Sequence, residues 1–101
     1  MTQNKFITAF QMHGDVPKFG ISQNDSGVTT AKIGTTIRIT HDYKKNDRME
    51  IVFVNNQQHF RIESDDQLQQ LIDMYRSIYK GYSNALEHRL LMWCTAHLNE
   101  C

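Results

Sequence analysis

Residues 35–53 read TTIRITHDYKKNDRMEIVF and contain two alternating runs separated by a polar loop. In the first run, Thr35–Tyr43, every second side chain from position 37 is isoleucine, histidine or tyrosine. In the second run, Arg48–Asn55, methionine, isoleucine and phenylalanine recur with the same period. A period of two is typical of a strand with one buried face, and a short loop joins antiparallel neighbours. The segment therefore predicts a β-hairpin.

Shorter runs of the same kind lie on both sides of this hairpin, separated by turn-forming residues. We expect further strands at Asn4–His13, Lys18–Ser22, Val28–Ile33 and His59–Glu63. Gly34 interrupts an extended run, and we interpret it as a bulge or bend rather than a full reversal. The sequence thus predicts an antiparallel β-meander of about five strands over residues 1–63.

After residue 63 the hydrophobic period changes from two to about 3.6, which is the period of an α-helix. Ser64 and Gln67 have the spacing of a capping box, and Asp65 and Asp66 suit the positive end of a helix dipole. We therefore expect a helix over residues 64–80 that ends at Gly81.

A second helix start at Ser83-Asn84 predicts a helix over residues 84–99. Leu91 and Met92 lie off its apolar stripe, so this helix either shares its surface with both the first helix and the sheet or meets a partner. The expected fold class is α+β, with two C-terminal helices packed on one face of the sheet.

Length and composition are those of one globular domain over residues 1–101, with 40% hydrophobic and 22% charged side chains. There are 11 Lys and Arg side chains against 11 Asp and Glu, so the formal net charge is zero. A nonspecific nucleic-acid binder normally has a basic excess and a nucleic-acid mimic an acidic one. The sequence shows neither a signal peptide nor a run of about 18 apolar residues, so we expect no membrane association.

The two cysteines are Cys94 and Cys101, and both fall in the expected last helix. Seven helical residues separate them by roughly 10 Å, beyond the ~7 Å limit for a disulfide, so we expect free thiols and a cytoplasmic location. With His97 they would share one helix face, and thiolate and imidazole suit zinc. Structural zinc sites take four ligands from separate elements, so we expect neither a metal nor a cofactor.

Other candidate catalytic groups have structural explanations. His41 shares a strand face with Ile37 and Ile39, whereas His59 lies on the opposite face, so the histidines do not form a cluster. Asp65 and Asp66 lie in the first turn of the expected helix, where capping accounts for them. We therefore expect no catalytic residue and no enzymatic activity.

Binding is the remaining kind of function, and two places favour it. At the hairpin tip we expect Tyr43, Lys44, Lys45 and Arg48 to contact a partner, with Arg38 and Arg61 on neighbouring strands. At the joint between the helices we expect Tyr79 and Tyr82 to stay at the surface, because a small sheet cannot bury every aromatic side chain.

The leading hypothesis is a small non-enzymatic protein-binding regulator or inhibitor. One form of it is an inhibitor of a host defence complex encoded by a phage or mobile element and acting in the host cytoplasm. The alternative is a nucleic-acid-binding regulator that uses the sheet and the basic hairpin tip. Homodimerisation is a further expectation, because the last helix has apolar surface on more than one side and an edge strand such as Asn4–His13 or His59–Glu63 is left unpaired.

Overall fold

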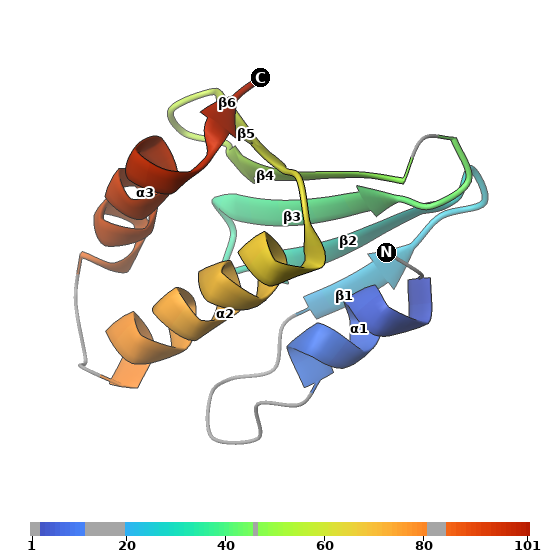
Figure 1. Cartoon of the computed structure of the whole chain (residues 1–101), viewed down its shortest axis with the longest axis horizontal. Helices are drawn as coiled ribbons and strands as arrows, with labels where there is room; N and C mark the ends of the chain where they lie inside the picture. The colour runs from blue at the N-terminus through green and yellow to red at the C-terminus, as the bar shows by residue number, and fades with distance from the viewer. Residues whose placement is uncertain (1–2, 12–19, 46, 81–84) are drawn as a thin grey trace.

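The computed structural model of the chain describes residues 3–11, 20–45, 47–80 and 85–101 (Figure 1). In chain order the elements are α1 (Gln3–Gln11), β1 (Gly20–Gln23), β2 (Val28–Ile33), β3 (Ile37–Asp42), β4 (Arg48–Phe53), β5 (Gln58–Ile62), α2 (Asp65–Lys80), α3 (Leu86–His97) and β6 (Asn99–Glu100).

The strands form one antiparallel sheet of six strands in the order β1-β2-β3-β4-β5-β6. The predicted hairpin over residues 35–53 is confirmed as β3 and β4, with Ile39 directly opposite Ile51. Burial alternates along both strands, as the period of two predicts. One face of the sheet is therefore apolar and the other, which we call the open face, is polar.

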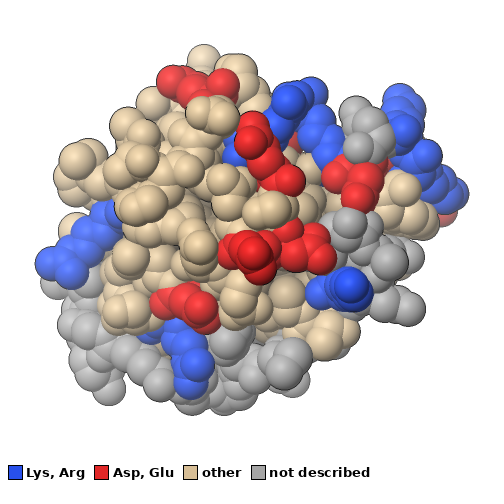
Figure 2. Space-filling view, viewed as in Figure 1, with Lys and Arg blue, Asp and Glu red and all other residues tan. Residues whose placement is uncertain are grey.

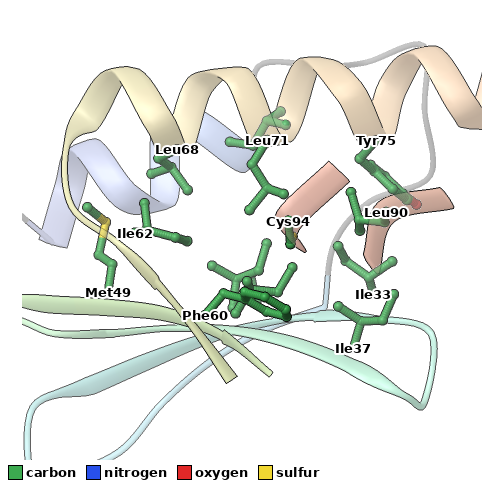
Figure 3. Close-up of a cluster of buried hydrophobic side chains, with 14 of the residues drawn as sticks. Ile33, Ile37, Met49, Phe60, Ile62, Leu68, Leu71, Tyr75, Leu90 and Cys94 are labelled. Carbon is green, nitrogen blue, oxygen red and sulfur yellow. The ribbon is translucent and has the colours of Figure 1, made fainter. Parts of the chain in front are cut away.

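All three helices lie over the apolar face, and the core fills the space between them and the sheet (Figures 1 and 3). From α3, Leu90 and Cys94 are buried. From α2 the buried side chains are Leu68, Leu71, Ile72, Tyr75 and Ile78. Figure 3 shows these side chains pointing down onto Phe60 and Ile62 of β5 and the neighbouring strands. The predicted α+β class, with both C-terminal helices on one face, is confirmed.

The start of α2 follows its predicted capping chemistry. The Ser64 hydroxyl oxygen accepts a hydrogen bond from the Gln67 backbone N–H at 3.1 Å. The Gln67 side-chain oxygen accepts one from the backbone N–H of Glu63 at 2.7 Å, one residue earlier than in a standard capping box. At α3 the N-cap is Ala85, which makes no side-chain capping bond, and the predicted start at Ser83-Asn84 lies outside the described residues.

The predicted strand Asn4–His13 is wrong, because Gln3–Gln11 form the helix α1. Phe6 and Phe10 are both buried, and their rings meet edge-on with centroids 5.0 Å apart. A spacing of four places two side chains on one face of a helix and also on one face of a strand. The pattern was therefore compatible with both periods, and packing over the sheet selects the helix. Met12 and His13, the rest of the predicted strand, lie outside the described residues.

The interpretation of Gly34 as a bend within one strand is also wrong. Residues 34–36 form a turn that reverses the chain, so that Ile33 pairs with Ile37 across an antiparallel hairpin. Gly34 has φ +63°, a left-handed conformation that glycine adopts at little cost. Residues 28–42 are therefore two strands rather than one.

The last helix is shorter than predicted, because α3 ends at His97 and the chain becomes extended at Leu98. Leu98 is buried, and the residues after it pair with β5 as β6. The Cys101 backbone N–H donates to the His59 carbonyl at 2.9 Å. The strand predicted at His59–Glu63 is therefore not an edge, since β6 covers it. Among the described helices, none is long and apolar enough to cross a membrane.

Candidate functional site

The cysteine and histidine chemistry considered from the sequence is not assembled in the fold. Cys94 is completely buried in the core, and burial raises the pKa of its thiol to about 12. Cys101 is exposed on the open face, where its sulfur lies 4.0 Å from a carboxylate oxygen of Glu50. His97 is exposed on α3 and its Nδ1 bonds the Trp93 carbonyl at 2.9 Å. Within the described parts of the chain, no group of three His, Cys, Asp or Glu side chains is placed to hold a metal ion.

His41 and His59 lie on opposite faces of the sheet, as strand parity predicts. His41 is fully buried, and its ring stacks on Phe6 with centroids 5.3 Å apart. Its Nε2 lies 2.5 Å from a carboxylate oxygen of Asp47. His59 is exposed, with Nδ1 3.5 Å from Glu50. The buried histidine therefore fixes the loop between β3 and β4 to the core.

The hairpin tip holds Tyr43 and Lys44 against the neighbouring turn between β1 and β2. The Lys44 ammonium donates to the Asp25 carbonyl at 3.4 Å and lies 6.0 Å from the centre of the Tyr43 ring. Its alkyl chain covers Gly27, where an added Cβ would lie 2.6 Å from two Lys44 carbons. Gly27 has φ +89°, so this turn needs glycine both for its backbone and for its space. Lys44 therefore has a structural role at this turn.

Lys45 and Arg48 are the other two predicted hairpin residues. The Lys45 side chain is exposed, and its backbone N–H donates to Asp42 Oδ1 at 3.1 Å. Arg48 is on the open face of β4, where its Nε lies 3.5 Å from Glu50 Oε2. Figure 2 shows basic side chains at the end of the sheet that carries the β3–β4 hairpin tip, and acidic side chains over the start of α2. Of the predicted hairpin set, Lys44 therefore contacts the β1–β2 turn, whereas Arg48 lies on the open face beside Glu50.

Tyr79, one of the two predicted helix-joint residues, does not face α3. Tyr79 is 40% exposed in the last turn of α2, with its ring 6.3 Å from that of Tyr75. Nine residues, or roughly 180° around the helix, separate it from Gln70, which faces α3. Tyr82 lies outside the described residues.

Between α2 and α3 runs a shallow groove of about 370 Å³, whose lining residues are Gln70, Asp73, Met74, Ser77, Trp93 and His97. The rings of Trp93 and His97 stack at 4.7 Å, with an interplanar angle of 17°. Met92 precedes Trp93 and lies on the outer side of α3. It is 58% exposed, which is the largest exposure of any big apolar side chain among the described residues. Met92, Trp93 and Ala96 share one side of α3. Together with Met74, which lines the same groove from α2, we call them the α3 surface.

The open face of the sheet is polar and carries both signs of charge. One row across the six strands is Ser22, Thr30, Thr40, Glu50, Arg61 and Asn99. The neighbouring row contains Lys32, Arg38, Val52 and His59. No aromatic side chain other than the His59 imidazole lies in these two rows, which the structure describes in full.

No protein-family model, curated protein or solved structure matches this chain. The exposed apolar α3 surface and the charged open face are the two surfaces that bear on its function. Met92 and Arg38 stand out in the sequence, but the pairing of Arg38 with Lys32 does not. The two residues are equidistant from Thr35, so reading Gly34 as a reversal would have placed them opposite each other.

Proposed function

We propose that this protein is a non-enzymatic protein-binding module that docks a partner on the α3 surface. The exposure of Met92 carries the proposal, because a large apolar side chain in water costs free energy that a partner recovers by covering it. Methionine and tryptophan are also enriched at protein–protein interfaces. The groove beside Trp93 gives such a partner a recess for one apolar side chain.

The charges around the α3 surface suit a polar rim. Asp73 accepts a hydrogen bond from the Gln69 side chain at 3.0 Å, and Arg89 and His97 are exposed on α3. An apolar centre surrounded by polar side chains is the usual arrangement of a protein interface. The high pKa of Cys94 also supports a binding role over a catalytic one, because that thiol stays protonated near neutral pH.

Regulation or inhibition by occluding the partner is the mode of action that we propose for so small a module. An inhibitor of a host defence complex, encoded by a phage or mobile element, is the specific form to test. Co-expression with a defence system should then restore plating of a phage that the system restricts. A Met92→Glu variant should lose this effect, because it places a charge at the centre of the α3 surface.

Photo-crosslinking tests the α3 surface directly. A photoreactive phenylalanine derivative placed at Met92 should capture one protein from an extract of the source cells. The matched control places it at Thr8, which is exposed on α1. A protein captured equally at both positions would contradict the proposal, whereas capture of a second copy of this chain would identify a homodimer as the partner complex.

Nucleic-acid binding on the open face is the second candidate, and the exposed Lys32, Arg38 and Arg61 side chains favour it. It ranks lower because single-stranded nucleic acids are held mainly by stacking on aromatic rings, which the two open-face rows supply only through the exposed imidazole of His59. A gel-shift titration at low and moderate salt tests it. Binding that weakens with salt and is lost in a Lys32, Arg38 and Arg61 triple alanine variant would raise it to first place.

A further inference from the structure

Two positive side chains lie directly opposite each other on the open face of the β2–β3 hairpin. Lys32 pairs in register with Arg38, and both are exposed. Like charges at directly opposite positions of an antiparallel pair are destabilising. Neither residue has an ion pair with any described acidic side chain. The hairpin therefore carries an unfavourable arrangement that its own fold does not compensate.

The acidic side chains of the open face are engaged at other positions. Both carboxylate oxygens of Glu50 are within 3.5 Å of a neighbour, one near Arg48 Nε and the other near His59 Nδ1. Asp42 accepts the Lys45 backbone N–H at the far end of β3. Beside Lys32 lies Gly20 of β1, and beside Arg38 lies Val52 of β4, neither of which has a charge. The positive charge at this end of the sheet is left open to a ligand.

We propose that an acidic segment of a protein binds here, with two of its carboxylates on Lys32 and Arg38. Opposite Cβ atoms in an antiparallel pair are about 5 Å apart, so two neighbouring anionic side chains can meet both cations. A guanidinium and an ammonium bind carboxylates well when the rest of the surface is complementary.

The rest of the open face favours carboxylates on a protein over a nucleic-acid backbone. A single-stranded nucleic acid gains much of its affinity from stacking its bases on aromatic rings, and the two open-face rows offer only the His59 imidazole for this. An acidic protein segment needs no such stacking, because its carboxylates bind the two cations directly. This site lies on the opposite face of the sheet from α3, so it does not depend on the α3 surface, and a molecule that uses both would join two partners.

An NMR titration of the ¹⁵N-labelled protein with an acetylated hexaglutamate peptide at low salt tests the proposal. Amide shifts should centre on β2 and β3 around Lys32 and Arg38. The double variant Lys32→Gln, Arg38→Gln should bind about tenfold more weakly, the factor that two exposed ion pairs supply together. The matched variant Lys44→Gln, Lys45→Gln removes the same charge from the hairpin tip and should bind as wild type does.

Three results would overturn the proposal. The first is an equal loss in both double variants, which would show a response to net charge alone. The second is a set of shifts centred away from β2 and β3. The third is tighter binding of a six-nucleotide oligothymidylate at Lys32 and Arg38 than of hexaglutamate, which would assign the site to nucleic acid. Crosslinking at Met92 is independent of all three, so this inference and the proposed function fail separately.

Discussion

Cys94 shows at the scale of one residue how burial sets chemistry. The thiol lies among apolar side chains of α3 and the sheet, where a thiolate would lose its hydration. Its pKa in the folded protein is therefore raised from an ordinary 9.0 to about 12. A group whose pKa is raised on folding contributes stability below its unfolded pKa and loses that contribution as pH rises toward the folded value.

The free energy of unfolding should therefore fall between about pH 9 and pH 12 because of Cys94. Within this range Cys94 lowers the free energy of unfolding by about 1.4 kcal/mol for each pH unit. Urea denaturation across this range should show a shallower decline for Cys94→Ala than for the wild type. Burial also raises the pKa of Tyr75, so a Tyr75-dependent decline should remain in the variant. Identical slopes in the two proteins would contradict the assignment to Cys94.

At the scale of the element, the β2–β3 hairpin combines a favourable turn with an unfavourable charge pair. Replacing either cation by glutamine should raise the free energy of unfolding by a few tenths of a kcal/mol at low salt. A double-mutant cycle over Lys32→Gln and Arg38→Gln should give a repulsive coupling that disappears in high salt. Lys45→Gln is the control, since it removes an exposed charge elsewhere. Destabilisation by both single variants would show that the pair stabilises the hairpin.

How far the sequence predicts each element depends on whether its spacing fits one period or two. The alternation in residues 35–53 fits only a strand, and the stripe after Ser64 fits only a helix, so both are confirmed. Phe6 and Phe10 are four apart, which fits either, and only packing over His41 decides for α1.

The two errors at Gly34 and Leu98 have a different cause. In each case the pairing of strands decides the structure, and the local spacing of residues does not show which strands pair. Gly34 fits a bulge or a turn, and the pairing of β2 with β3 decides between them. Leu98 continues a helical pattern, yet pairing with β5 draws the residues after it into the sheet. The Lys32 and Arg38 site was missed for the same reason, since it exists only once the hairpin register is known.

At the scale of the whole molecule, α1 completes the cover over the apolar face of the sheet, although it is far from α2 and α3 in sequence. Phe6 is fully buried and touches the ring of His41 in the central strand β3. The helices thus enclose one continuous core rather than two. A change in α1 should therefore weaken the entire domain.

Phe6→Ala should lower the free energy of unfolding by about 3–5 kcal/mol, because it leaves a cavity beside a buried imidazole. Thr8→Ala on the same helix is the matched control, since Thr8 is exposed and should change stability little. Urea denaturation followed by circular dichroism measures both. A Phe6→Ala protein as stable as the control would mean that α1 is not part of the cooperative core.

The positions of Trp93 and Cys101 have an optical consequence. The chain contains a single tryptophan, and it lies at the α3 surface, while the one exposed cysteine is on the open face of the sheet. Indole emission therefore reports from one side of the molecule, and a dye on Cys101 reports from the other. A partner that quenches one signal and not the other reveals the side on which it sits, and energy transfer between the two probes follows any change in the thickness of the domain.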